Sequence, residues 1–276
     1  MRSLLIVAGI ALVGAASAQV PASGRYVAMG SSYSAGPGVG TPDGASGRCA
    51  RSMSNFARQV ATRRHLMLVD VSCSGATTDN ILAHGQHDFP AQIEAVTPDT
   101  KLVSILIGGN DIDYVGTLGG LSCRDTGSTN CRIADPATVG AKFAALPGRL
   151  DQVVAAVRRR APAARIVLIG YLPAVPASGG GCAALPLSAS DIDRMRGVTI
   201  RLAQVIGGAA ARNHVGVVRS SELGRGHDAC SARPFVVGYH PPRNPGWPGP
   251  VAYHPNQAGM DRVAQALDVV IGSQDF

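Results

Sequence analysis

Five short apolar segments alternate along the chain with longer segments in which apolar residues recur at helical spacing. The short segments are rich in Val, Ile and Leu and occupy 26–30, 66–72, 102–108, 165–171 and 215–219. Near-continuous apolar runs of this length are typical of strands that are buried on both faces, which means a parallel sheet covered by helices.

The segments between these runs supply the helices. Helical spacing is clear in 54–64, 139–160, 188–214 and 256–272, and Ser188 with Asp191 resembles a capping box at the start of the third. Alternating strands and helices predict a three-layer α/β/α sandwich with a five-stranded parallel sheet. Such folds bind ligands beyond the carboxyl ends of the strands, so functional residues are expected directly after each apolar run.

Two segments, 173–186 and 238–255, are dense in Gly and Pro and are expected to be ordered loops. The second is too long to be a mere connection between two elements.

The first eighteen residues have the pattern of an export signal. Met1 and Arg2 precede an apolar run, and Ala16-Ser17-Ala18 forms an A-x-A cleavage site. The apolar run falls short of the roughly 20 residues that a spanning helix needs, which argues against a membrane anchor. We expect residues 1–18 to be a signal peptide, 19–276 to be one domain, and the mature protein to be secreted or periplasmic.

The formal charge of +7 becomes +6 once Arg2 is removed, and the basic residues are nearly all arginine. The only clusters, 61–65 and 158–160, fall where helices should end, and cations are favourable there. Without interleaved aromatic residues or a known module, nucleic-acid binding is not expected. Weak attraction to anionic surfaces is the simpler use of the charge. We expect a monomer.

Six cysteines behind an export signal indicate disulfides, because disulfides persist outside the cytosol. They can pair in 15 ways. Pairing between cysteines that are neighbours in the sequence is the simplest arrangement. The chain contains no C-x-x-C spacing, so neither a zinc ribbon nor a thioredoxin-like site is expected. The cysteines are Cys49, Cys73, Cys123, Cys131, Cys182 and Cys230.

Groups able to cleave an ester stand at the ends of the predicted strands and before the last helix. Cleavage needs a nucleophile, a base that takes its proton, and donors aimed at the oxygen that becomes negative. Ser32 can be the nucleophile and His254 the base. The donors can be the N–H groups of Ser32 and Gly75 and the side-chain amide of Asn110. A glycine at position 75 lets the backbone approach a bound carbonyl closely.

These segments resemble the SGNH (GDSL-type) hydrolase family over nearly the whole mature chain. "GSSYSAG", "SGA", "GGND" and "YHPNQAG" are similar to its four blocks, in the same order. The resemblance implies a flavodoxin-like α/β/α fold, no cofactor, a nucleophilic Ser32, oxyanion donors at Ser32, Gly75 and Asn110, and His254 as base. The cysteines are similar to those of the secreted three-disulfide lipases and esterases of actinomycetes. That similarity implies the pairs Cys49–Cys73, Cys123–Cys131 and Cys182–Cys230.

Two positions depart from the family pattern. The family usually has Asp where this chain has Ser31, and often has Asp where it has Val251. Without that acid the base lacks the carboxylate that would fix its tautomer. We expect the backbone carbonyl of Val251 or Ala252 to orient His254, which would give a Ser–His dyad.

The resulting hypothesis is a carboxylic ester hydrolase that forms an acyl-enzyme, with lipid and short-chain esters as substrates. Tyr239 and Trp247 are expected to form one wall of the acyl groove. A carbohydrate acetylesterase of the same fold is the nearest alternative. A relative that binds acyl or glycan groups without turnover is the alternative from another class.

Other polar residues have plainer interpretations. Ser34 is expected to be structural, and Asp111 to be a supporting group. His84 and His87 could suggest a metal, but the intervening glycine and the nearby Phe-Pro favour a turn, so no metal is expected. His240 is a spare candidate base that lacks a following helix.

Overall fold

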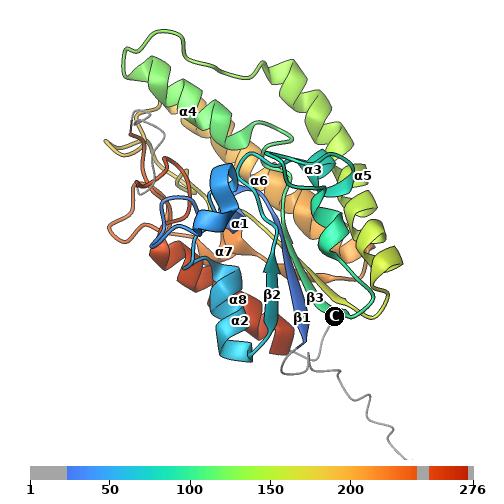
Figure 1. Ribbon diagram of the computed structural model, residues 1–276. Helices are drawn as coiled ribbons and strands as arrows, with labels where there is room; N and C mark the ends of the chain where they lie inside the picture. The colour runs from blue at the N-terminus through green and yellow to red at the C-terminus, as the bar shows by residue number, and fades with distance from the viewer. Residues whose placement is uncertain (1–23, 241–248, 273–276) are drawn as a thin grey trace, which may run out of the picture.

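Five parallel strands form a single sheet in the order β2-β1-β3-β4-β5. Figure 1 labels the first three of them, β2, β1 and β3. The computed structural model describes residues 24–240 and 249–272. The strands are β1 (Arg25–Gly30), β2 (Met67–Asp70), β3 (Thr100–Leu106), β4 (Arg165–Ile169) and β5 (Gly216–Val218). The predicted α/β/α sandwich with a five-stranded parallel sheet is confirmed. The predicted signal peptide and Trp247 lie outside the described residues.

β2, β4 and β5 are shorter than the apolar runs that predicted them, and β3 ends two residues before its run does. β3 ends at Leu106 and β4 at Ile169, yet Ile107 and Tyr171 beyond them are buried. An apolar run reports burial, and the chain stays buried after it leaves the sheet. The functional loops therefore begin beneath the surface.

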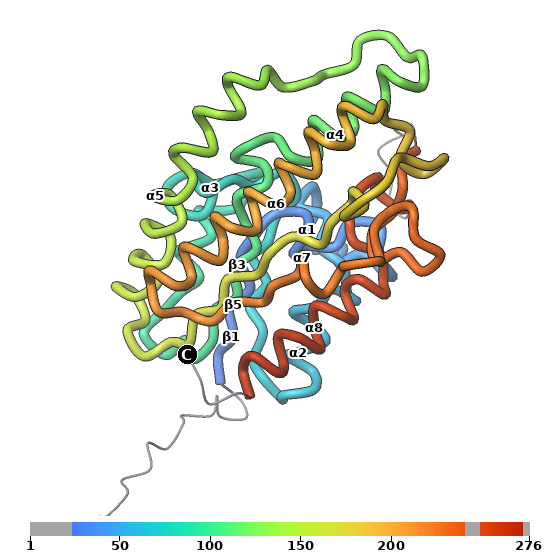
Figure 2. The backbone as a smooth tube through the Cα atoms, turned by 180° about the vertical axis from the view of Figure 1, so that it is seen from behind, coloured from blue at the N-terminus to red at the C-terminus, as the bar shows by residue number. Residues whose placement is uncertain are grey.

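Helices cover both faces of the sheet. The α-helices are α1 (Ser32–Ala35), α2 (Phe56–Arg64), α3 (Thr78–Leu82), α4 (Tyr114–Asp125), α5 (Pro136–Arg160), α6 (Ala189–Arg212), α7 (Ser220–Leu223) and α8 (Gln257–Gly272); η1 (Gly44–Cys49) and η2 (Gln92–Ala95) are short 3₁₀ helices. α2 and α8 pack together on one face, and α5 and α6 pack together on the other (Figures 1 and 2). Among the described residues, no helix is long and apolar enough to cross a membrane.

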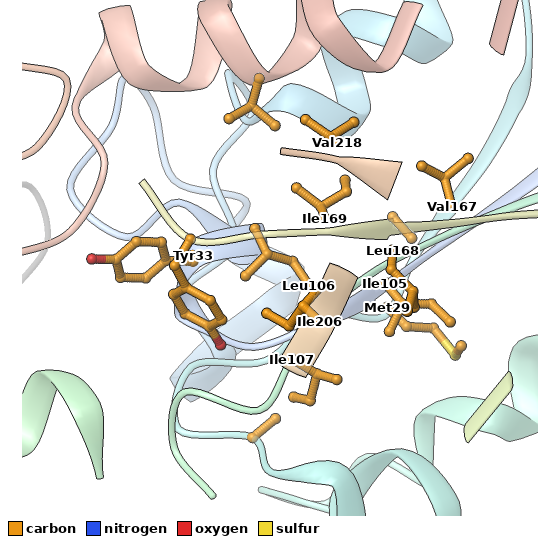
Figure 3. Close-up of a cluster of buried hydrophobic side chains, with 14 of the residues drawn as sticks. Met29, Tyr33, Ile105, Leu106, Ile107, Val167, Leu168, Ile169, Ile206 and Val218 are labelled. Atoms are coloured by element: carbon orange, nitrogen blue, oxygen red, sulfur yellow. The ribbon is translucent and has the colours of Figure 1, made fainter. Parts of the chain in front are cut away.

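The central strands carry the core. Figure 3 shows the part of it around Leu106, Ile169 and Ile206, where β3, β4 and α6 meet. All three side chains are buried, as the near-continuous apolar runs require of strands with a helix layer on each side.

The four predicted helices begin and end close to the expected residues. Asn55 caps α2, and the Ser188 Oγ of α6 accepts the Asp191 N–H at 3.2 Å. The reciprocal half of the predicted capping box is absent, because the Ser188 N–H donates to Asp125 instead. Both arginine clusters do lie in the last turns of helices, namely those of α2 and α5.

α4 is a helix that the apolar pattern did not indicate. It contains three glycines, which lower helix propensity. A Cβ at Gly120 would lie 1.9 Å from the Arg132 carbonyl oxygen, so the following loop packs directly on the helix there. Tertiary packing, which local sequence does not show, selects glycine at this position.

Three disulfides cross-link the chain. They join Cys49 to Cys73, Cys123 to Cys131 and Cys182 to Cys230, which are the pairs that the family resemblance implies. Cys73 lies two residues before Gly75, and the Ser74 N–H donates to the Cys49 carbonyl at 3.0 Å. This disulfide therefore anchors the loop that carries Gly75.

The disulfides should differ in their contribution to stability according to the loop that each closes. Cys182 and Cys230 are 48 positions apart, and Cys123 and Cys131 only 8. Chain entropy then predicts a loss of about 4 kcal/mol for Cys182→Ala/Cys230→Ala and about 2.5 kcal/mol for Cys123→Ala/Cys131→Ala. Urea unfolding of the two double variants measures this difference. An equal or larger loss for the shorter loop would contradict the entropic account.

Candidate active site

A tight turn follows β1 and leads directly into Ser32. The Gly30 φ is +148°, and a Cβ there would lie 2.5 Å from the Leu106 carbonyl oxygen, so the position requires glycine. The buried amide of Gln92 bonds to both backbone groups of Gly30, accepting its N–H at 2.7 Å and donating to its carbonyl at 3.0 Å. The Ser31 N–H donates to Leu106 at 3.0 Å. The backbone beneath Ser32 is thus held from two sides.

Ser32 and His254 are in hydrogen-bond contact although they are 222 positions apart. The Ser32 Oγ lies 2.8 Å from the His254 Nε2, and the His254 Nδ1 lies 2.9 Å from the Ala252 carbonyl oxygen. A carbonyl only accepts, so Nδ1 carries the proton and Nε2 presents a lone pair to the serine hydroxyl. The side chains of this pair are almost withdrawn from water, with Ser32 9% and His254 8% exposed.

The loop before α8 aims the histidine. Tyr253 has a φ of +61°, a left-handed conformation that a bulky residue adopts only when its surroundings impose it. Val237 pairs with this loop on both sides, donating to the His254 carbonyl at 2.8 Å and accepting the Tyr253 N–H at 2.9 Å. The Tyr33 hydroxyl donates to the Tyr253 carbonyl. Several bonds therefore fix the backbone around His254.

Burial lowers the pKa of His254 to about 4, and the hydrogen bond to Ala252 opposes this shift only in part. A carboxylate at the same place would favour the imidazolium by its charge, whereas a carbonyl supplies only a dipole. His254 is consequently neutral at pH 7 and able to accept a proton.

The loops after β2 and β3 bring Gly75 and Asn110 to the same edge of the sheet. The Cys73 N–H donates to the Gly30 carbonyl at 3.0 Å, and the Asn110 Nδ2 donates to the Ala76 carbonyl at 2.9 Å. One hydrogen bond thus ties the Gly75 loop to the turn before Ser32, and the other ties it to Asn110.

The three expected donors remain available. Asn110 retains its second amide hydrogen, since Ala76 takes only one. In residues 24–240 and 249–272, neither the Ser32 N–H nor the Gly75 N–H donates to another group. Gly75 has a φ of +85° and is exposed, so a ligand oxygen can approach its N–H.

Asp111 supports this region from beneath. Its carboxylate accepts the Thr78 N–H at 3.1 Å and the Thr78 hydroxyl at 2.5 Å, at the first residue of α3. Burial raises the pKa of Asp111, and the bonds from Thr78 counteract part of that rise. The residue after Asn110 is therefore anchored to the segment that follows Gly75.

The remaining candidates lie elsewhere or have other partners. His84 Nδ1 bonds to Asp79 at 2.6 Å, and His87 and Asp88 have positive φ in the predicted turn. No group of three or more His, Cys, Asp or Glu side chains is placed to hold a metal within the described part of the chain. The histidine that contacts Ser32 is His254, not His240.

Sequence reasoning missed three residues that shape the site: Gln92, Tyr33 and Tyr171. Tyr33 and Tyr171 could have been found by the rule that found the others, because both follow a strand. Gln92 lies on η2, away from any strand end, and no local pattern marks it.

The sequence and the fold match known proteins over most of their length. The model of the GDSL-like Lipase/Acylhydrolase family matches residues 28–262. Lipase 2 of Streptomyces coelicolor is 32% identical, over 94% of this chain and 89% of its own.

Two crystal structures have the same fold throughout. One is the extracellular lipase of Streptomyces rimosus, with a TM-score of 0.72 and 30% identity. The other is phospholipase A1 of Streptomyces albidoflavus, with a TM-score of 0.72 and 28% identity. Each comparison covers 90% of this chain and 100% of the other.

The depressed pKa of His254 should set the acidic limit of activity. Because the folded pKa of about 4 lies below the ordinary 6.5, the ring stays neutral through pH 5. The kcat/KM for a soluble p-nitrophenyl ester should therefore fall in acid only near pH 4. A fall in kcat/KM centred near pH 6.5 would contradict a buried, neutral His254.

The same shift predicts how stability depends on pH. The folded state takes up a proton on His254 less readily than the unfolded chain does. The contribution of the neutral ring to the free energy of unfolding is therefore complete above about pH 6.5 and is lost as the pH falls toward 4. The free energy of unfolding, measured in urea at pH 7 and at pH 5, should fall less between the two in a His254→Gln variant than in the wild type. Equal losses would contradict the linkage.

Proposed function

The chain belongs to the GDSL-like lipase/acylhydrolase family, and from this premise we propose that Ser32 and His254 form the catalytic dyad of an exported lipase or esterase. The protein is a carboxylic ester hydrolase. The observation that carries the proposed mechanism is the 2.8 Å contact between the Ser32 Oγ and the His254 Nε2, with the His254 Nδ1 held by Ala252.

The first half of the reaction forms an acyl-enzyme. The Ser32 Oγ bonds to the ester carbonyl carbon while its proton passes to the His254 Nε2. The carbonyl oxygen becomes negative and accepts hydrogen bonds from the N–H groups of Ser32 and Gly75 and from the Asn110 amide. The carbonyl then re-forms, the bond to the alcohol oxygen breaks, and His254 gives its proton to the departing alcohol.

The second half releases the acid. A water molecule gives a proton to the His254 Nε2 and attacks the acyl carbon, so that the oxyanion forms again among the same donors. The bond to the Ser32 Oγ breaks, and His254 returns the proton to that oxygen. Ala252 accepts the Nδ1–H throughout, so Nε2 is the nitrogen that exchanges protons with the reacting groups.

Acyl lipids are the proposed substrate class. The relatives at 28–32% identity are named lipases and a phospholipase A1, and each aligns with nearly the whole chain. Their names support lipid esters over acetylated sugars. Tyr239 and Trp247 remain the proposed wall of the acyl groove.

Export is proposed from the terminal pattern and the disulfides. Residues 1–18 read as a cleavable signal peptide, and three disulfides suit an oxidising compartment. The mature chain would begin at Gln19, and its charge of +6 would permit weak contact with anionic surfaces.

A fluorophosphonate probe tests whether Ser32 is activated. The exported protein, with an intact mass that matches a chain from Gln19, should carry one label on the Ser32 peptide. Ser32→Ala should abolish labelling. Ser34→Ala is the matched control, because Ser34 is also buried and only two positions away, and its hydroxyl has no hydrogen-bond partner within residues 24–240 and 249–272. Labelling that survives in Ser32→Ala, or is absent from the folded wild type, would overturn the mechanism.

A substrate panel tests the proposed class. We expect higher kcat/KM for phosphatidylcholine and long-chain glycerides than for acetyl-xylan. The reason is that the relatives that match nearly the whole chain are named a lipase and a phospholipase A1. A preference for acetyl-xylan would favour a carbohydrate acetylesterase. Retention of an acyl ligand with no turnover of any ester would favour a binding protein.

A further inference from the structure

The hydroxyl of Tyr171 lies between two turns of the site. Tyr171 follows β4 and is 4% exposed. Its hydroxyl oxygen accepts the Gly109 N–H at 2.8 Å and lies 3.4 Å from the Ser31 Oγ. Gly109 immediately precedes Asn110, and Ser31 immediately precedes Ser32. One hydroxyl therefore touches the neighbours of both an oxyanion donor and the nucleophile.

The turn at Gly109 is built directly on this ring. A Cβ at Gly109 would lie 2.7 Å from the ring and from the hydroxyl of Tyr171, so a side chain there would clash. The Gly109 carbonyl accepts the Tyr114 N–H at 2.9 Å. Both backbone polar groups of Gly109 are thus paired, and Tyr171 is the partner of one.

Other rings hold Tyr171 in place. The ring of Tyr33 lies 4.7 Å from it and that of Tyr114 lies 6.0 Å away, both measured between centroids. Tyr33 also lies 5.3 Å from the His254 ring. Aromatic packing of this kind restricts the ring, so its hydroxyl occupies a fixed point.

Burial keeps the hydroxyl protonated. It raises the pKa of Tyr171 above its ordinary value, and the bonds to Ser31 and Gly109 oppose this only in part. The oxygen accepts the Gly109 N–H and shares a second, longer hydrogen bond with the Ser31 Oγ, in which either hydroxyl can be the donor. Ser31 stands where the family usually has Asp, and its hydroxyl is the second partner of the Tyr171 hydroxyl.

We propose that the Tyr171 hydroxyl is a positioning group for the reaction, because it holds the Gly109–Asn110 turn and the Ser31–Ser32 turn at a fixed spacing. This proposal rests on the proposed roles of Asn110 and Ser32. Without the hydroxyl, the buried Gly109 N–H loses its acceptor, and the turn shifts to find another. A displacement of about 1 Å in a reacting group costs on the order of 10²-fold in rate.

Tyr171→Phe removes only the hydroxyl and keeps the ring. We expect kcat to fall by roughly 10- to 100-fold with KM nearly unchanged, since the lost alignment matters in the transition state. Tyr26→Phe is the matched control. The Tyr26 hydroxyl is also buried and bonds to the Ser104 Oγ at 2.7 Å, but it lies within the sheet. The Tyr26→Phe variant should be less stable than the wild type but should keep its kcat.

A double-variant cycle separates positioning from mere stability. Asn110→Ala alone should lower kcat by about 10²–10³-fold. If Tyr171 acts through Asn110, adding Tyr171→Phe to Asn110→Ala should lower kcat by less than about three-fold more. Ser31→Ala is a second test, because it removes the other hydrogen-bond partner of the Tyr171 hydroxyl. This variant should lower the rate of phosphonate labelling of Ser32.

The outcomes distinguish this inference from the proposed function. Full kcat in Tyr171→Phe while Asn110→Ala is impaired would overturn the positioning role and leave the mechanism standing. Losses that multiply in the double variant, together with an unchanged rate of phosphonate labelling of Ser32 in Ser31→Ala, would also overturn it. Full activity in Asn110→Ala would overturn the oxyanion assignment itself, and the positioning role with it.

Discussion

The contact between Ser32 and His254 is the interaction on which the rest of the site depends. It joins the first strand end to the loop before the last helix, across 222 positions of sequence, at 2.8 Å. A parallel sheet makes this possible because all its strands deliver their carboxyl ends to one edge. The contact also needs a defined tautomer, and the carbonyl of Ala252 supplies it from only two residues away. The histidine loop thus orients its own base.

Neutral groups hold the backbone at Gly30, Tyr253 and Gly109. Gln92 fixes Gly30, Tyr33 fixes the Tyr253 carbonyl, and Tyr171 fixes Gly109, all through uncharged hydrogen bonds. Such an arrangement suits a buried histidine, since among the described residues no carboxylate bonds to it, and burial lowers its pKa to about 4. The chain therefore keeps His254 neutral, and in the proposed mechanism the positive charge that develops on it is balanced by the oxyanion.

Much of this architecture was predictable because it follows from burial and strand geometry. The apolar runs gave the five strands, and the rule that ligands bind beyond strand ends led to Ser32, Gly75 and Asn110. What escaped prediction depends on packing between distant segments. Gln92 lies on η2 yet pairs with Gly30, and Gly120 in α4 is explained by its contact with the loop at Arg132. The choice of Ala252 over Val251 as acceptor depends on the backbone angle at Tyr253, which no local pattern reveals.

The central claim is that a backbone carbonyl, in place of a carboxylate, holds a neutral His254 with its Nε2 lone pair facing Ser32. Nitrogen-15 NMR of the histidine-labelled protein at pH 7 tests it most directly, with His254→Gln used to assign the resonances. The structure predicts a protonated Nδ1 and an unprotonated Nε2 for His254. A proton on Nε2, or a charged ring at pH 7, would contradict the account.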